Sequence, residues 1–265
     1  MIIQNYVKPA NLEEAYALLV KSKGNRLLGG GTFLKRTHLR VANAIDLSDC
    51  GLDYLKKEKD GLHIGAYTSL RKLETSEEVL TQCGNVLKDP LSHLIGVQLR
   101  NQITIGGHVA PRFGFSDIIP ALMILDAKLE FYHRGEISLI SYMEEEKPEK
   151  DILTEIFIPE EGRKGKMQSM RISYNDYSVF GLGVSRCKNS WIIAAGNFPG
   201  RAKCASAVMK ETEGRKVTKK DAGMLSGKIA ESFVYGSNYR GSAEYRKELC
   251  RVFARRAIEE LADEN

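Results

Sequence analysis

The chain has 265 residues, of which 43% are hydrophobic and 28% charged, and these proportions are ordinary for a globular protein with a substantial core. Its 39 lysines and arginines, against 34 acidic residues, are spread along the whole sequence, whereas nucleic-acid-binding proteins concentrate basic residues on one element. No apolar run approaches the roughly 20 residues that cross a bilayer, and the first residues do not resemble a signal peptide. We therefore expect a cytoplasmic protein that binds neither nucleic acid nor membrane.

The N-terminal region predicts a compact β-α-β unit. Asn11-Leu12-Glu13-Glu14 is typical of a capping box, so we expect a helix to begin there and to end at Gly24. Short strands are predicted at residues 26–28 and 44–47. Three consecutive glycines, Gly29-Gly30-Gly31, follow the first of these strands.

The rest of the chain alternates short strands and helices, with a linker composition at residues 160–165. Polar residues at 56–60 predict a turn. We expect an N-terminal domain at 1–162, with subdomains at about 1–55 and 56–162, and a C-terminal domain at 163–265. Strands are predicted at 62–66, 127–132, 137–140, 152–158, 170–174, 178–185 and 190–195; helices are predicted from Thr68 or Ser69 to about residue 80, at 90–97, from Ser116 or Asp117 onward, and at 221–235 and 242–262.

Cysteine and histidine are scattered along the sequence. None of the five cysteines forms a Cys-x-x-Cys pair, and the five histidines lack metal-ligand spacing. An odd number of cysteines also argues against a disulfide framework. We therefore expect no metal site, and redox chemistry must come from an organic cofactor or from another chain.

The first glycine loop has a backbone suited to phosphate. It matches neither Gly-x-x-x-x-Gly-Lys-Ser/Thr nor Gly-x-Gly-x-x-Gly. Because glycine approaches a ligand closely, the N–H groups from Gly30 to Leu34 and the Thr32 hydroxyl could donate to a pyrophosphate. Taken alone, however, three glycines after a strand are more typical of a plain tight turn.

The second glycine loop repeats the pattern. Thr104-Ile105-Gly106-Gly107 again places an apolar residue before two glycines, and Arg100-Asn101 stand just before it. The alternative is a glycine hinge between a helix and a strand, with Arg100 on the surface. Together the two loops predict a dinucleotide site in which they hold the two phosphates from opposite sides.

Three polar residues near these loops each have two interpretations. Asp117, beside Ser116, is a sound N-cap, but its carboxylate could also accept hydrogen bonds from ribityl or ribose hydroxyls. His108 is either a flavin neighbour or, as we favour, a hydrogen-bonded structural residue. Asp46 could be mistaken for the ribose-binding acid of a Rossmann unit, yet its place in a strand favours a structural role.

These motifs, in this order, resemble the FAD-binding medium subunits of molybdenum hydroxylases such as xanthine, nicotinate and carbon monoxide dehydrogenases. The resemblance spans nearly the whole chain. The motifs that carry it are Lys8-Pro9, Leu12-Glu13-Glu14-Ala15, Gly29-Gly30-Gly31-Thr32, Ile64-Gly65-Ala66 with Thr68 and Leu70, Arg100-Asn101, Thr104-Ile105-Gly106-Gly107, Ser116-Asp117, Pro120-Ala121-Leu122, Leu125-Asp126-Ala127 and Gly241-Ser242-Ala243-Glu244-Tyr245-Arg246.

The resemblance implies an α+β fold: a p-cresol methylhydroxylase-type FAD-binding fold in two subdomains, then a C-terminal domain of a three-stranded sheet and a helix bundle. In that family the two glycine loops grip the FAD pyrophosphate, the residues matching Ser116 and Asp117 contact its sugar-like portion, and the residue matching Leu153 packs on the flavin ring. No catalytic residue or metal ligand is implied. The expected FAD-binding residues are Leu28, Gly29, Gly30, Gly31, Thr32, Phe33, Leu34, Ile103, Thr104, Gly106, Gly107, His108, Ser116, Asp117 and Leu153.

The sequence departs from the family pattern at several places. His108 stands where asparagine is usual, and Phe33 where an acidic residue is common. Pro111-Arg112-Phe113-Gly114-Phe115 replaces an Ala-Ser-Pro run, and this bulkier segment is expected to alter access to the flavin ring. A lysine near the flavin pyrimidine has no clear match, Lys166 and Arg171 being the nearest basic residues. We expect FAD binding to survive these changes, while the choice of electron acceptor stays open.

The resemblance implies an oxidoreductase subunit. It would receive electrons from a [2Fe–2S] subunit, fed by a molybdenum cofactor-binding subunit, and pass them to NAD or another acceptor. An alternative is a nucleotide-binding regulatory or assembly module of the same fold without redox turnover, which the replaced 111–115 segment supports. A self-contained flavin oxidase fits less well, because no acid–base cluster for a substrate is recognisable.

Overall fold

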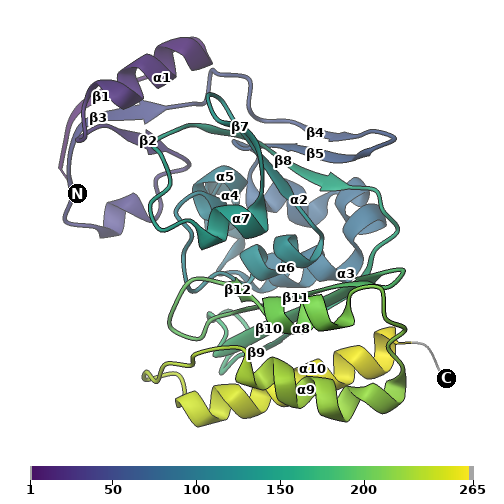
Figure 1. Cartoon of the computed structure of the whole chain (residues 1–265). Helices are drawn as coiled ribbons and strands as arrows, with labels where there is room; N and C mark the ends of the chain where they lie inside the picture. Colours follow the sequence, from purple (N-terminus) through teal and green to yellow (C-terminus); the bar gives the residue numbers. More distant parts are fainter. Residues whose placement is uncertain (1, 263–265) are drawn as a thin grey trace.

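A computed structural model describes residues 2–262 and has the predicted α+β architecture (Figure 1). The N-terminal part is a parallel three-stranded sheet with the order β1-β3-β2. Helix α1 begins where the Asn11 side chain accepts a hydrogen bond from the Glu14 N–H, and it buries Ala15 and Leu19 beside Ile45 of the sheet. The elements are β1 (Ile2–Val7), α1 (Leu12–Lys21), β2 (Arg26–Leu28), the 3-10 turn η1 (Leu34–Arg36) and β3 (Arg40–Asp46).

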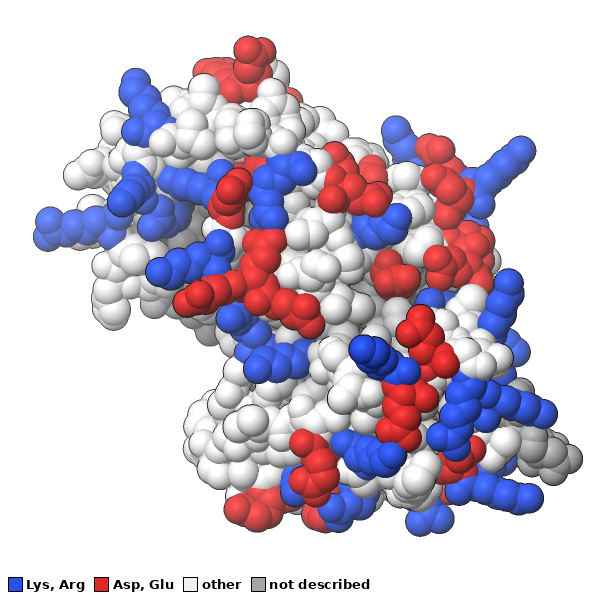
Figure 2. All heavy atoms as spheres, viewed as in Figure 1, with Lys and Arg blue, Asp and Glu red and all other residues white. Residues whose placement is uncertain are grey.

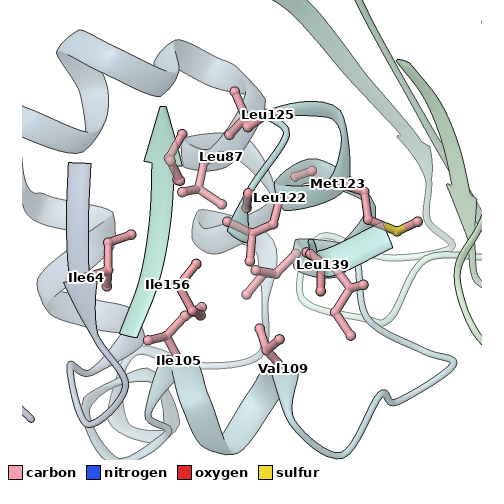
Figure 3. Close-up of a cluster of buried hydrophobic side chains, with 14 of the residues drawn as sticks. Ile64, Leu87, Ile105, Val109, Leu122, Met123, Leu125, Leu139 and Ile156 are labelled. Atoms are coloured by element: carbon pink, nitrogen blue, oxygen red, sulfur yellow. The ribbon is translucent and has the colours of Figure 1, made fainter. Parts of the chain in front are cut away.

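The middle of the chain builds an antiparallel five-stranded sheet with the order β4-β5-β8-β6-β7. Its helices share one apolar core with the sheet, in which Ile64, Leu122 and Ile156 are completely buried (Figure 3). The elements are β4 (Leu55–Lys57), β5 (Gly61–Gly65), α2 (Leu70–Thr75), α3 (Glu77–His93), α4 (Val97–Gln102), α5 (Ile105–Val109), α6 (Ile118–Ile124), β6 (Lys128–Phe131), β7 (Gly135–Ser138), α7 (Leu139–Glu144) and β8 (Leu153–Pro159).

The C-terminal part is an antiparallel sheet with the order β12-β11-β10-β9. Helix α6 packs on one face, while α9 and α10 lie on the other (Figure 1). Since both faces are covered, β10 and β11 are buried along most of their length. The elements are β9 (Lys164–Met170), β10 (Phe180–Cys187), β11 (Ser190–Gly196), β12 (Lys203–Cys204), α8 (Ser206–Thr212), the 3-10 turn η2 (Lys219–Asp221), α9 (Ala222–Glu231) and α10 (Ala243–Leu261).

Close packing of α6 on this sheet depends on a glycine. A Cβ added at Gly183 would lie 2.9 Å from the Ile124 side chain. The glycine therefore allows the helix to approach the strand, and this contact fixes the C-terminal sheet against the middle of the chain.

Several predicted elements have different bounds. The strand predicted at 170–174 is wrong: β9 occupies Lys164–Met170, so the predicted linker overlaps it. As an edge strand with half-buried polar residues, β9 lacks the apolar alternation that marks a strand. Pro90, predicted to begin a helix, lies inside α3, which contains a non-helical residue at Gly84. The N-terminal capping box is also incomplete, because the Glu14 carboxylate accepts from the Ala10 N–H.

The sequence did not predict β1, β4, α4, α5, α7, α8, β12 or the 3-10 turns η1 and η2. Two of these replace other expectations: the second glycine loop lies in the first turn of α5, and α7 begins inside the strand predicted at 137–140. Strand β1 is largely exposed at a sheet edge, and β4 has a polar sequence, so neither gives a hydrophobic pattern. The two-residue strand β12 adds a fourth strand to the three expected in the C-terminal sheet.

Charges of both signs are interspersed over most of the face drawn in Figure 2, which agrees with the absence of one basic element in the sequence. Among residues 2–262, no helix combines the length and apolarity needed to span a membrane.

Candidate functional site

A cavity of about 390 Å³ lies among the three parts of the chain. The loop after β2 contributes Gly29 and Thr32, the middle of the chain contributes Gly107 and Leu153, and the C-terminal part contributes Tyr177. This volume lies within the usual range of small-molecule and cofactor sites, and most of the lining residues are apolar.

The two glycine loops touch each other at this cavity. A Cβ added at Gly29 would lie 2.7 Å from the Thr104 Oγ1 and 2.8 Å from the Gly107 Cα. A Cβ added at Gly107 would lie 2.7 Å from the Gly29 carbonyl oxygen. Both positions therefore need glycine, since any side chain would force the loops apart.

Gly30 and Gly31 give the first loop its shape. Both have left-handed backbone, with φ of +74° and +68°. A Cβ at Gly30 would lie only 1.7 Å from the Gln102 carbonyl oxygen, whereas a Cβ at Gly31 would meet nothing within 4 Å. Gly30 is thus packed against the segment before the second loop, and Gly31 lines the cavity.

The two loops differ in their hydrogen bonding. In the second loop, the Gly107 N–H donates to the Thr104 Oγ1 and the Gly106 N–H to the Ala66 carbonyl. In the first, the N–H groups of Gly31, Thr32 and Phe33 donate to no other described group. The first loop therefore has free donors beside the cavity, while the second provides a smooth glycine surface that a ligand can approach closely.

His108 is buried and lines the cavity. Its Nε2 lies 2.7 Å from the Ser116 hydroxyl, which also accepts from the Ile119 N–H and so caps α6. Burial lowers the pKa of His108 to about 4, so the imidazole is neutral near pH 7. His108 is therefore a hydrogen-bonded structural residue, as we favoured, and also part of the cavity wall.

Acid should weaken the fold through His108. Because its pKa falls from 6.5 to about 4 on folding, the unfolded chain alone binds this proton between those pH values. The resulting stability is complete above pH 6.5 and declines as the pH falls, by about 3 kcal/mol in total. Urea unfolding at pH 7 and pH 4.5 should show a smaller pH difference for His108→Asn than for the wild type. An unchanged difference in His108→Asn, with His133→Asn as the control, would contradict this assignment.

Asp117 is buried at the contact between α6 and the C-terminal sheet. Its carboxylate accepts hydrogen bonds from Arg171, Ser178 and, at 2.7 Å, Asn197. Burial raises the pKa of Asp117, and the adjacent Arg171 guanidinium opposes that rise. The N-cap interpretation of the Asp117 side chain is wrong, because Ser116 supplies the capping oxygen and Asp117 makes no side-chain cap.

Four aromatic rings from distant segments form one side of the cavity, and we call them the aromatic wall. Phe33 lies 4.1 Å from Phe113, Phe113 lies 4.9 Å from Phe115, and Phe115 lies 4.9 Å from Tyr177, measured between ring centroids. Each such contact contributes roughly 0.5–1.5 kcal/mol beyond simple burial. Three of the residues that depart from the pattern the resemblance implies, Phe33, Phe113 and Phe115, therefore meet in one place, and Tyr177 joins them.

Arg100 is not on the surface, as the hinge alternative had it, but buried. It forms a two-pronged ion pair with Glu74 and donates to the carbonyl oxygens of Leu94 and Ile95. Ile95 lines the cavity with a left-handed φ of +52°, a costly conformation for a β-branched residue. The Arg100 bonds help to hold this turn in place.

Most of the expected FAD-binding residues line the cavity, but Gly30, Ser116 and Asp117 do not. Asp46 is structural, as favoured, since it accepts from Tyr6 and Tyr67. Lys166 and Arg171 pair with Glu260 and Asp117 and do not line the cavity. The expected residues that line it are Leu28, Gly29, Gly31, Thr32, Phe33, Leu34, Ile103, Thr104, Gly106, Gly107, His108 and Leu153.

Sequence reasoning missed other lining residues. Phe113 and Phe115 carried a signal, because they depart from the family pattern, but they were not assigned to the site. Tyr177 carried none. The other missed residues are Arg26, Leu27, Thr37, Leu39, Leu47, Leu52, Ala66, Tyr67, Leu94, Ile95, Leu99, Ala110, Pro111 and Asp151.

Comparison with known families places this cavity in context. Residues 2–161 match the family described as the FAD binding domain in molybdopterin dehydrogenase, and residues 167–261 match the CO dehydrogenase flavoprotein C-terminal domain. The chain belongs to the FAD-binding medium subunits of the molybdenum hydroxylases. As a member of these medium subunits, it is a flavoprotein oxidoreductase subunit that binds FAD.

Individual proteins that are similar to this chain over nearly its whole length are also medium subunits or have the same fold. The glyceraldehyde dehydrogenase medium chain of Sulfolobus acidocaldarius is 25% identical over 97% of this chain and 98% of its own length. The nicotine 6-hydroxylase medium subunit of Paenarthrobacter nicotinovorans is 25% identical over 96% of both chains. The solved structure of reconstituted CO dehydrogenase from Oligotropha carboxidovorans has the same fold, with a TM-score of 0.84 and 24% identity over 98% of both chains.

Proposed function

We propose that the cavity holds FAD with its diphosphate at the contact between the two glycine loops. The observation that carries this proposal is that Gly31, Thr32 and Phe33, whose N–H groups donate to no other described group, line the same cavity as Gly106 and Gly107, which leave room for a ligand. A pyrophosphate needs several donors and a close approach to the backbone, so the residues present fit this group.

Different residues have different proposed tasks. The first loop donates to the diphosphate, and Gly106 and Gly107 leave space for it. Leu153, at the start of β8, supplies an apolar surface for the flavin ring, while His108 stays neutral and hydrogen-bonded to Ser116. Asp117 contributes indirectly, by holding the C-terminal sheet against α6, because its carboxylate already accepts hydrogen bonds from Arg171 and Asn197. We propose the domain limits 1–162 and 163–265 for these two units.

Bound FAD supplies both single-electron and hydride chemistry. We propose that this chain receives electrons from a [2Fe–2S] subunit, which a molybdenum cofactor-binding subunit feeds, and that the electrons leave to NAD or another acceptor. The chain itself positions and shelters the cofactor. These tasks require no general acid or base from this chain.

Flavin retention tests this function. The purified chain, loaded with FAD and desalted, should keep about one flavin per chain, seen as absorbance near 450 nm. Anaerobic mixing with the reduced partner complex should then bleach that absorbance. A chain that loses all flavin on desalting would contradict the proposed site.

The aromatic wall favours a second candidate, a nucleotide-binding regulatory or assembly module without redox turnover. Its bulky rings occupy one side of the cavity, and two of them belong to the 111–115 segment, which the resemblance implies is bulkier here. The partner complex separates the two candidates: retained flavin that this complex cannot reduce favours the regulatory module, whereas rapid reduction favours the electron-transfer subunit.

A further inference from the structure

The aromatic wall joins all three parts of the chain across one side of the cavity. Phe33 belongs to the loop after β2, Phe113 and Phe115 to the segment between α5 and α6, and Tyr177 to the connection between β9 and β10. All four residues line the cavity. The wall therefore stands between the cofactor space and whatever approaches from that side.

Two of the three segments are firmly anchored. Arg112, with a left-handed φ of +54°, donates to the carbonyl oxygens of Tyr142 and Glu145, and a Cβ at Gly114 would lie 2.3 Å from the Gly200 carbonyl oxygen. The Tyr177 ring packs under Arg240.

The third segment is held less tightly. Phe33 is 44% exposed and directly precedes the short turn η1. The Phe113, Phe115 and Tyr177 rings are therefore held in place, whereas the Phe33 ring is the most exposed member of the aromatic wall.

The cavity is also poorly equipped for a second dinucleotide. Among the described residues that line it, Arg26 is the only lysine or arginine. The free donors of the first loop serve one diphosphate. A pyridine nucleotide would bring another diphosphate, for which the lining residues provide no further cluster of cationic groups.

We propose that the aromatic wall keeps small-molecule acceptors from reaching the flavin on its side of the cavity, and that the electron acceptor of this subunit is a one-electron redox centre carried by a docked protein. This inference rests on the proposed function. A hydride moves only when donor and acceptor atoms come within roughly 3–3.5 Å, so a wall of packed rings blocks its transfer. A single electron can tunnel through packed side chains. Two successive transfers, each to a freshly oxidised centre, would remove the two electrons of reduced FAD, and the two protons would leave to solvent.

Iodide quenching of flavin fluorescence tests the wall without relying on turnover. In the FAD-loaded chain, we expect a quenching constant at least fivefold below that of free FAD. Phe113→Leu should raise the constant at least threefold, and Phe33→Ala should raise it as much in the fraction of chains that keep their flavin. Tyr245→Ala is the matched control, because Tyr245 is 42% exposed on α10, does not line the cavity and should behave as the wild type.

Acceptor assays complete the test. After anaerobic photoreduction, the wild-type flavin should be reoxidised at least tenfold faster by an oxidised Rieske-type [2Fe–2S] protein, whose potential is high enough to accept the electrons, than by NAD⁺. Phe33→Ala should reduce this ratio of the two rates. The proposal would be overturned if the quenching constants of the wild type and Phe113→Leu were equal. Rapid reoxidation of the wild-type flavin by NAD⁺ would also overturn it. Loss of flavin from every variant, the wild type included, would instead contradict the proposed function.

Discussion

Gly30→Ala is expected to abolish FAD retention. The new Cβ would lie 1.7 Å from the Gln102 carbonyl oxygen, a backbone atom that cannot rotate away, and the left-handed φ of +74° adds strain. The loops must separate to relieve this overlap, and their separation removes the surface that faces the diphosphate. We expect FAD to bind at least about 100-fold more weakly, measured as flavin per chain after desalting and by fluorescence titration.

Gly51→Ala is the matched control for Gly30→Ala. Gly51 has a similar φ of +72°, but a Cβ there meets nothing within 4 Å, and the residue does not line the cavity. This control should cost only the strain of a left-handed alanine, about 1–2 kcal/mol of stability, and should keep its flavin. If Gly30→Ala does not fold, Gly107→Ala tests the direct contact between the two loops without left-handed strain, because its Cβ would lie 2.7 Å from the Gly29 carbonyl oxygen. Full flavin retention in a folded variant of either loop would remove that loop from the site.

The two glycine loops could be predicted because their signal is local. Adjacent glycines beside threonine stand out in any sequence, and their order with the other motifs identifies the family. Their mutual contact could only be inferred. The close approach of the Gly30 backbone to the Gln102 carbonyl depends on how two sheets and a helix pack together. No short stretch of sequence determines that packing.

The fold was predicted best where hydrophobic periodicity is strong. Helix α10 and strand β5 are close to their expected bounds, since each buries one clear apolar set. Edge strands such as β1 and β9 give no such pattern, because one side of each lies open to solvent or to a loop. Boundaries at these edges therefore needed the structure.

The polar residues of the site were the hardest to predict. Asp117 looked like a helix cap or a ligand for ribityl hydroxyls, yet its partners Arg171, Ser178 and Asn197 are ordinary residues far along the chain. Tyr177 likewise becomes part of the cavity only through tertiary packing. Such long-range pairs leave no spacing signal in a single sequence.

Removing the Asp117 carboxylate should destabilise the whole protein. Asp117→Ala leaves the Arg171 guanidinium, which is 11% exposed, without its ion-pair partner, and it also strips a hydrogen bond from Asn197. An unpaired buried charge of this kind costs about 3–5 kcal/mol. Because the carboxylate joins α6 to the C-terminal sheet, the unfolding midpoint in urea should fall sharply. The flavin affinity of the part that remains folded should change less than in Gly30→Ala.

A double-mutant cycle identifies the cause of that loss. If the unpaired charge dominates, Asp117→Ala combined with Arg171→Ala should be less destabilised than the sum of the single variants, by a coupling of about 1–3 kcal/mol. Asp117→Asn keeps the shape of the side chain but not its charge, so it should lie between the wild type and Asp117→Ala. Additive losses would mean that the ion pair contributes little. A sharp loss of flavin in Asp117→Asn, with stability near that of the wild type, would instead assign the carboxylate to the cofactor, as the family resemblance implied. The cycle therefore decides between two physical roles for one buried charge: holding the C-terminal sheet in place, or binding the hydroxyls of FAD.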